Sequence, residues 1–328
     1  MKVGILVYDG CLCSEAFGFA DLLHMANRVS TMRTPLDPAP FDICLVGAQS
    51  GFITATHGVR LNVEVMPSDL DLLVVPAFDF ADLHDLDRCL DMYEPEALLL
   101  QKTMNRVQIA SICMGSFLLG RAGVLDGREA TTAWVFAAEL ARRFPAASVQ
   151  PEALIIEDRG VTTTGAFSAA HDLALKIIRE NTNDDLARAI GRVALLETGR
   201  TNQAAYIDAD LLRAMRPPFA RSVRHQLKRR LAEPYDLKTL AGDLCVSPRT
   251  LLRRFKAETG LTPLEELQAL RISQAKRLLE STTLSLGEIA LNVGYQDNST
   301  FARLFVRLAK ITPAVYRRRF RNDQAKDA

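Results

Sequence analysis

The stretch Ala110-Ser-Ile-Cys-Met-Gly-Ser-Phe-Leu-Leu119 places one cysteine between the end of an apolar run and the beginning of a helix-like segment. Small residues stand two positions before Cys113, at Ser111, and two positions after it, at Gly115. This is the pattern of a nucleophile elbow, a sharp strand-to-helix turn that exposes one side chain above a parallel sheet. The stretch therefore predicts such a turn at Cys113 and raises the question of whether the thiol reacts.

The sequence around this turn alternates between strand-like and helix-like segments. Short, nearly continuous apolar runs lie at 2–8, 41–46, 71–75 and 107–112, helix-like stretches lie between them at 15–26 and 94–104, and a later strand and closing helix follow at 160–164 and 166–179. Strands that are apolar throughout are buried on both faces. We therefore predict an α/β domain with a flavodoxin-like parallel sheet and helices on both faces. Ligands bind beyond the carboxyl ends of such strands, where Cys113 would lie.

Charge is distributed unevenly along the 328 residues. Residues 1–180 carry 14 Lys+Arg and 23 Asp+Glu, a net charge of −9. Residues 181–328 carry 26 Lys+Arg and 16 Asp+Glu, a net charge of +10. This asymmetry suggests an acidic module joined to one that binds a polyanion.

Composition and cysteine spacing exclude several classes of protein. No apolar run approaches the roughly 20 residues of a membrane span, and the N-terminus reads as a strand rather than a signal peptide. We therefore expect a cytoplasmic protein with no membrane partner. The six cysteines show no paired CxxC spacing, which predicts neither a zinc site nor a disulfide framework. The Cys11-Leu-Cys13 pair is interpreted as a bystander, and no metal or cofactor is expected.

Several features together resemble a known family over about the first 180 residues. The first strand ends in Tyr8-Asp9-Gly10, Glu15 follows, Cys113 lies on its elbow, and Leu118-Leu-Gly-Arg-Ala-Gly-Val-Leu-Asp-Gly-Arg-Glu-Ala-Thr-Thr-Ala-Trp134 comes next. This arrangement resembles the PfpI-like branch of the class I glutamine amidotransferase superfamily. The resemblance implies that Glu15 and Cys113 face each other across one pocket.

Two departures from that family argue against catalysis. Relatives usually read Thr-Thr-His-Trp after the elbow, whereas this chain has Ala133 where the histidine, the general base, is expected. Relatives also carry a Gly-Gly pair for the oxyanion where this chain has Ala77-Phe78. His171 could replace the base, but its place within a helix favours a packing role. We therefore predict no catalytic residue and no enzyme activity, because a cysteine without a base is a weak nucleophile.

The elbow can still bind a ligand. The backbone amides of Met114 and Gly115, at a helix N-terminus, would suit an anionic group, and Glu15 would suit a cationic one. Trp134 and Phe78 could wall the pocket and offer a π face, although core packing explains both equally well. The expected ligand is a small cationic or zwitterionic metabolite, such as an amino acid or a quaternary ammonium compound. The expected ligand-binding set is Glu15, Ala77, Phe78, Cys113, Met114, Gly115 and Trp134.

The basic half of the chain contains one pattern twice. Leu237-Lys-Thr-Leu-Ala-Gly-Asp-Leu-Cys-Val-Ser-Pro-Arg-Thr-Leu-Leu-Arg-Arg-Phe255 aligns with Leu286-Gly-Glu-Ile-Ala-Leu-Asn-Val-Gly-Tyr-Gln-Asp-Asn-Ser-Thr-Phe-Ala-Arg-Leu-Phe305 after a one-residue insertion. Each copy reads as a short helix, a tight turn and a second helix with an i, i+4 apolar pair. We therefore predict an all-α domain with two helix-turn-helix motifs.

This duplicated pattern resembles the AraC/XylS DNA-binding domain over residues 219–322, which implies a double-stranded DNA operator as partner. In the first recognition helix Leu251, Leu252 and Phe255 are expected to pack inward, and in the second Phe301, Leu304 and Phe305. Arg249, Thr250, Arg253 and the outward residues of the second helix would approach bases, and the others phosphates. The expected DNA-binding set is Arg249, Thr250, Arg253, Arg254, Lys256, Asn298, Ser299, Thr300, Arg303 and Arg307.

The expected organisation is a ligand-sensing and dimerisation domain at 1–182, a helical linker at 183–218, a DNA-binding domain at 219–322 and a tail at 323–328. The linker would hold a helix at 187–197 and a Pro-Pro breaker near its end. This whole arrangement resembles the GlxA family of transcriptional regulators. The resemblance implies a ligand-responsive homodimer that activates metabolic genes, with RNA polymerase as a further partner. Two alternatives stay open, both acting through Cys113: a cysteine amidase or hydrolase, and a redox sensor.

Overall fold

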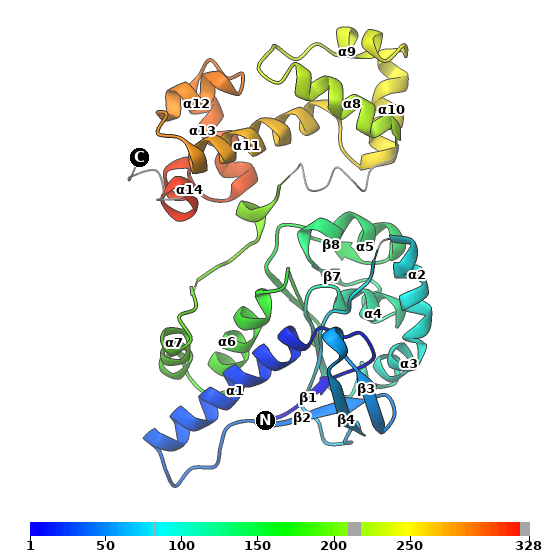
Figure 1. Cartoon of the computed structure of the whole chain (residues 1–328), viewed down its shortest axis with the longest axis vertical. Helices are drawn as coiled ribbons and strands as arrows, with labels where there is room; N and C mark the ends of the chain where they lie inside the picture. Colours follow the sequence, from blue (N-terminus) through cyan, green and yellow to red (C-terminus); the bar gives the residue numbers. More distant parts are fainter. Residues whose placement is uncertain (82, 198, 209–217, 322–328) are drawn as a thin grey trace. The chain divides into compact units, whose positions relative to one another are not determined.

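The computed structural model describes residues 1–81, 83–197, 199–208 and 218–321. The chain divides into two compact units, Met1–Gln203 and Ala204–Ala328, whose elements are labelled in Figure 1. Most of the expected breaker, Arg216 and Pro217, and the tail at 323–328 lie outside the described residues. Within the described residues, no helix combines the length and the apolarity needed to cross a membrane.

An eight-stranded sheet with the order β3-β4-β2-β1-β5-β6-β10-β9 forms the centre of the N-terminal unit. The pairs β3–β4 and β10–β9 at its edges are antiparallel, and the pairs between them are parallel. The α/β prediction is confirmed, with the four expected strands at β1, β2, β5 and β6. The strands are β1 Lys2–Leu6, β2 Asp42–Gly47, β3 Gly51–Thr54, β4 Arg60–Val65, β5 Leu72–Val75, β6 Gln108–Ser111, β9 Ile155–Asp158 and β10 Val161–Thr164, with β7 Glu129–Ala130 and β8 Ser148–Val149 in a separate two-stranded sheet.

Helices cover both faces of this sheet. Helices α1, α6 and α7 pack together on one side, and α2, α3, α4 and α5 form a second group on the other (Figure 1). Helix α1 runs well past the expected end at residue 26, because the Asn27 side chain exchanges two hydrogen bonds with the backbone of Phe41 at the entrance to β2. The helices are α1 Cys13–Arg33, α2 Leu83–Met92, α3 Glu94–Thr103, α4 Gly115–Arg121, α5 Ala137–Arg143, α6 Ala169–Asn181 and α7 Asp184–Val193.

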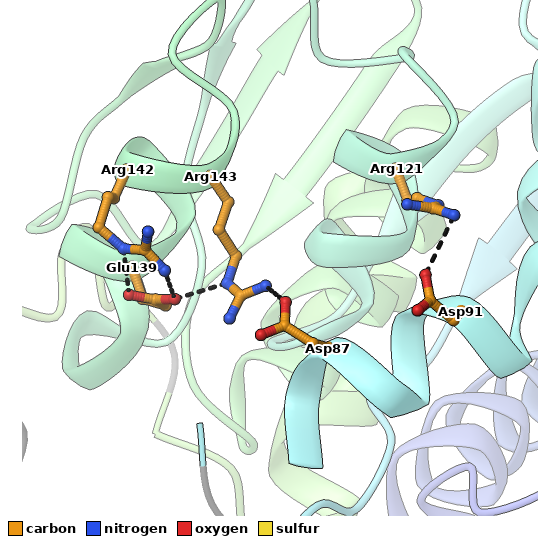
Figure 2. Close-up of polar contacts among 6 residues, drawn as sticks. All are labelled: Asp87, Asp91, Arg121, Glu139, Arg142 and Arg143. Carbon is orange, nitrogen blue, oxygen red and sulfur yellow. Dashed lines mark hydrogen bonds and ion pairs between the residues drawn. The ribbon is translucent and has the colours of Figure 1, made fainter. Parts of the chain in front are cut away.

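Ion pairs connect α2, α4 and α5. Figure 2 shows Glu139 of α5 between Arg142 and Arg143, and Arg143 reaching Asp87 of α2. In the same view Arg121, at the end of α4, pairs with Asp91 of α2, at 3.2 Å. The side chains of Glu139 and Arg143 are each only 12% exposed, so their pair is screened less than the exposed ones. The pairs through Arg143 therefore join α5 to α2, and the exposed pair through Arg121 joins α4, the helix that begins at the elbow, to α2.

Helix α7 belongs to the N-terminal unit, although residues 183–218 were expected to form a linker. It begins three residues earlier than expected because the Asn183 side chain caps it, accepting a hydrogen bond from the Leu186 amide. Its buried side, which includes Leu186 and Ile190, packs against α6 and α1. The compact unit therefore continues to Gln203 rather than ending at residue 182.

The C-terminal unit consists of helices arranged in two small cores along one shared helix. Leu267 and Leu270 of α11 belong to the first core, with Leu251 and Phe255, whereas Ala275 and other residues farther along α11 belong to the second. A buried ion pair between Arg224 of α8 and Glu266 of α11 fixes the first core further. The helices are α8 Pro218–Arg229, α9 Leu237–Asp243, α10 Pro248–Thr259, α11 Pro263–Ser281, α12 Leu286–Asn292, α13 Asn298–Ala309 and α14 Pro313–Phe320.

The two helix-turn-helix motifs are α9–α10 and α12–α13, as the repeat predicted. After the first helix of each motif one residue adopts a left-handed conformation, Cys245 with φ 54° and Gly294 with φ 84°. A Cβ at Gly294 would lie 2.7 Å from the Ala232 carbonyl oxygen, so only glycine fits there. Thr262 and Thr312 cap the helices that follow the two motifs, α11 and α14.

Candidate ligand pocket and nucleic-acid interface

Cys113 lies on a strained turn between β6 and α4. Its φ of 52° is in the left-handed region, which a cysteine adopts only when the surrounding structure holds it there. Gly115 allows this turn to lie against β5, because a Cβ at that position would be 2.3 Å from the Val75 carbonyl oxygen. The predicted elbow is therefore confirmed, and the Cys113 side chain is half-buried.

Glu15, in the first turn of α1, supplies a buried carboxyl group beside the elbow. Its side chain is 1% exposed, and Oε2 accepts a hydrogen bond of 2.8 Å from the Ala77 backbone N–H. Oε1 is buried without a hydrogen-bond partner. Burial raises the pKa of Glu15 to about 7, against the opposing effects of the Ala77 N–H and the Cys113 thiol. The carboxyl group therefore holds its proton at a higher pH than an ordinary glutamate.

The Cys113 sulfur faces Glu15, as the resemblance implied. The backbone N–H groups of Met114 and Phe167 also point at it. Burial first, and the Glu15 charge second, raise the pKa of the thiol to about 12. Both burial and a neighbouring carboxylate disfavour a thiolate, so the thiol is neutral near pH 7.

The structure corrects two expectations about the pocket. The Gly115 N–H donates to the Ile112 carbonyl at 2.8 Å and is not free for a ligand, because the tight turn itself needs that bond. The Phe78 ring is 2% exposed and packs against Tyr93, with centroids 5.1 Å apart, so its role is core packing. Of the expected set, Glu15, Ala77, Met114 and Gly115 are also buried, whereas Cys113 and Trp134 keep partial exposure.

Neither position considered for a general base places one beside Cys113. Ala133, which replaces the histidine of related sequences, is buried at 3% exposure. The His171 ring on α6 packs against Gly18 of α1. A Cβ added at Gly18 would lie only 3.2 Å from His171 Nε2. The side chain that contacts the Cys113 thiol is instead the Glu15 carboxyl.

Three residues near the elbow were not identified from the sequence. The Thr132 hydroxyl donates to the Cys113 carbonyl at 2.8 Å, and the N–H of Phe167 faces the sulfur. Gln203, 3% exposed, donates to the Thr132 carbonyl at 2.7 Å. Thr132 was within the motif already singled out, but nothing in the local pattern marks Phe167 or Gln203, which come from distant parts of the chain.

The first recognition helix, α10, presents a basic outer face. Ser247 caps it by accepting a hydrogen bond from the Thr250 N–H, and Pro248 is its first residue. Arg249, Arg253 and Lys256 are exposed, whereas Thr250 is half-buried.

One expectation for α10 needs correction. Leu252 is 37% exposed and does not pack inward, because it lies one position, about 100° of helix rotation, beyond the buried Leu251. Arg254 stacks its guanidinium 4.1 Å from the Phe219 ring of α8 and pairs with Glu258 at 2.8 Å. Its side chain is still exposed, and its contact with a phosphate stays a prediction.

The second recognition helix, α13, matches the first. Phe301, Leu304 and Phe305 are buried, as expected, and Asp297 caps the helix through the N–H groups of Ser299 and Thr300. The remaining expected residues of this helix are exposed: Asn298, Ser299, Thr300, Arg303 and Arg307. Arg307 bonds Gln268 of α11 at 2.9 Å. Arg253 and Arg303 occupy equivalent positions in the two motifs, two residues after the first buried apolar residue.

Residues 1–180 match the DJ-1/PfpI family, and residues 240–319 match a helix-turn-helix domain. A solved structure of a THiJ/PfpI family protein from Pseudomonas syringae shares the fold, with a TM-score of 0.50 and 21% identity over 65% of this chain and 84% of that one.

Two curated relatives are named as transcriptional regulators. The HTH-type transcriptional regulator GlxA of Rhizobium meliloti (strain 1021) is 30% identical over 217 residues, which cover 65% of this chain and 66% of that protein. The HTH-type transcriptional regulator CdhR of Pseudomonas aeruginosa is 28% identical over 269 residues, which cover 80% of this chain and 77% of that protein. The chain thus spans just under two thirds of the length of the GlxA regulator.

The raised pKa of Glu15 makes the stability of the N-terminal unit pH-dependent. The folded unit binds the Glu15 proton more tightly than the unfolded chain, so its stability falls as the pH rises from 4.5 to about 7. The full loss is about 3 kcal/mol. Glu15→Gln, which cannot ionise, should therefore raise the thermal unfolding midpoint more at pH 8 than at pH 5, and the exposed-site variant Glu64→Gln should not. An equal effect of Glu15→Gln at both pH values would contradict this account.

Proposed function

Because the chain belongs to the DJ-1/PfpI family over residues 1–180 and matches a helix-turn-helix domain over residues 240–319, we propose that it is a ligand-responsive, DNA-binding regulator of transcription. The observation that carries this proposal is the pair of equivalent recognition helices with exposed Arg253 and Arg303. The relatives named as transcriptional regulators support it.

The dimensions of the C-terminal unit support binding by both motifs. Helix α11 has 19 residues and is therefore about 28 Å long. Its two ends lie in the two cores, so each recognition helix packs against a different part of α11. Successive major grooves on one face of a duplex lie about 34 Å apart. Each helix can then enter one of two successive major grooves on the same face of a duplex.

We expect Arg253→Ala and Arg303→Ala each to weaken binding to a preferred duplex by about 1–3 kcal/mol, because each removes an arginine that reads a base. Affinity should also fall steeply with added salt. The control is Arg88→Ala, which removes one exposed arginine from the N-terminal unit and should change neither quantity. Binding is measured by fluorescence anisotropy on a duplex that the parent protein selects from a random pool. If both variants keep the parent affinity, these arginines do not read DNA.

The elbow is proposed as a non-catalytic sensor pocket for a small cationic or zwitterionic metabolite. Glu15 Oε1, Ser111 Oγ and Thr164 Oγ1 are buried without hydrogen-bond partners, and Ser111 and Thr164 end adjacent strands. Unpaired buried polar atoms are costly, and a polar ligand would satisfy them. Phe167, 51% exposed beside the elbow, can offer the π face first expected of Phe78.

A screen of amino acids, polyamines and betaines by thermal shift should yield a ligand that stabilises the parent protein. Its effect should be lost in Glu15→Gln, which removes the negative charge, and weakened in Phe167→Ala, which removes the exposed ring. Glu64→Gln is the control for the loss of one carboxylate. Stabilisation only by anionic or neutral compounds, or an unchanged response of Glu15→Gln, would show that the pocket does not select a cation.

The enzyme and redox alternatives both require a reactive Cys113 thiolate, which the thiol pKa of about 12 disfavours. The Ala77 N–H, a candidate oxyanion donor, is already bonded to Glu15.

Two further parts of the proposal rest on the resemblance of the whole chain to the GlxA family. The first is activation of metabolic genes through RNA polymerase, and the second is a homodimer formed by the N-terminal unit.

We expect Cys113→Ser to keep the parent affinity for DNA, because Cys113 belongs to the N-terminal unit and the DNA-binding residues to the other. Anisotropy on the selected duplex measures this, with Cys44→Ser, a half-buried cysteine of β2 in the same unit, as the matched variant. Enzyme-like turnover of amide or ester substrates by the parent protein, abolished by Cys113→Ser, would instead establish the hydrolase alternative.

A further inference from the structure

The chain passes from one unit to the other through a connecting segment, residues 199–208, that is held at both ends. On the N-terminal side, the Arg200 guanidinium pairs with Asp172 of α6 and donates to the Ser168 hydroxyl at 2.9 Å. The Gln203 backbone N–H donates to the Glu152 carbonyl at 2.8 Å. Residues 199–203 therefore form part of the N-terminal unit rather than a free tether.

The Gln203 side chain is the innermost contact of this segment. Its Nε2 shares two N–H groups among three backbone carbonyls, those of Thr132, Pro151 and Ala153, at 2.7, 3.1 and 3.1 Å. Its Oε1 accepts from the backbone N–H groups of Trp134 and Ala166, both at 3.3 Å. A buried amide with donors and acceptors all engaged is costly to displace, since each lost bond leaves an unpaired polar group.

Two of the loops that Gln203 joins, residues 131–134 and 165–167, are also the loops that border Cys113; we term them the elbow loops. The Thr132 hydroxyl donates to the Cys113 carbonyl, and the Phe167 N–H faces the sulfur. Gly165 leaves space for Gln203, because a Cβ there would lie 2.7 Å from Gln203 Oε1. A group entering the elbow and shifting either loop must therefore also disturb the Gln203 contacts.

The next residue, Ala204, is already held by the C-terminal unit. Lys276 of α11 is buried and donates to the carbonyls of Ala204, Ala205 and Ile207 at 3.1, 2.8 and 2.9 Å. Ala205 lies in the same core as Phe301 and Phe305 of the recognition helix α13. One peptide bond, with no free residue, thus joins the Gln203 contacts to the helix shared by both motifs.

We propose that Gln203 is the positioning residue through which the elbow and the DNA-binding unit sense each other's occupancy. This inference rests on the proposed function. A ligand that moves the elbow loops changes the hold on Gln203, and Ala204 and Lys276 carry that change to α11. Such coupling is reciprocal, so DNA bound at α10 and α13 must in turn alter the elbow loops.

The test is amide hydrogen exchange of the full chain, read by mass spectrometry, with and without the selected duplex. DNA should slow exchange in the elbow loops of the parent by about fivefold. In Gln203→Met, which keeps the side-chain volume but loses every amide bond, this effect should disappear while DNA affinity is kept. Gln101→Ala, at an exposed position of α3, should behave like the parent.

A second variant covers the case in which Gln203→Met does not fold. Insertion of Gly-Ser-Gly-Ser between Gln203 and Ala204 preserves the contacts of both residues but joins them by a flexible linker. It should therefore also abolish the slowing of hydrogen exchange in the elbow loops by DNA. The same insertion between the exposed residues Pro38 and Ala39 is the control. An unchanged effect in the 203/204 insertion, or no effect of DNA on the parent's elbow loops, overturns the proposal. A parent that binds no duplex contradicts the proposed function itself.

Discussion

The buried carboxyl group of Glu15 determines the chemistry of the N-terminal unit. Its Oε2 accepts a hydrogen bond from the Ala77 N–H, which a catalytic site would need to stabilise an oxyanion. Its Oε1 has no hydrogen-bond partner. Its charge adds to burial in raising the pKa of Cys113 to about 12. So high a thiol pKa disfavours the thiolate that a nucleophile at this elbow would need. An acid with a pKa of about 7 beside a neutral thiol is suited to binding a polar or cationic group.

The C-terminal unit depends on a different constraint, the sharing of one helix by two small cores. Neither core is large, and α11 contributes buried residues to both. The Arg271 side chain of this helix donates to the Leu231 and Glu233 carbonyls and stacks over Tyr295 of the second motif. The spacing of the recognition helices is therefore set inside the unit. Because α11 is rigid, a small displacement of Ala204 would change the position of both motifs.

The sequence predicted the features whose signals are local and periodic. The buried strands, the elbow and the duplicated motifs all follow from patterns between residues close in the sequence. The sequence did not predict features that depend on contacts between residues far apart in the chain. Phe78 packs against Tyr93, the residue before α3, and Asn27 in the later part of α1 bonds the Phe41 backbone; no local pattern specifies either contact. Gln203 was missed for the same reason, because its partners come from three separate loops.

Hydroxyl-radical footprinting of the selected duplex tests the central claim most directly. Two equivalent recognition helices at the ends of one helix of about 28 Å should protect two segments on the same face of the DNA, about 10 base pairs apart. Arg253→Ala should weaken one protected segment and Arg303→Ala the other. A single protected segment, or protection that both variants leave unchanged, would contradict the account of a regulator that reads DNA with both motifs.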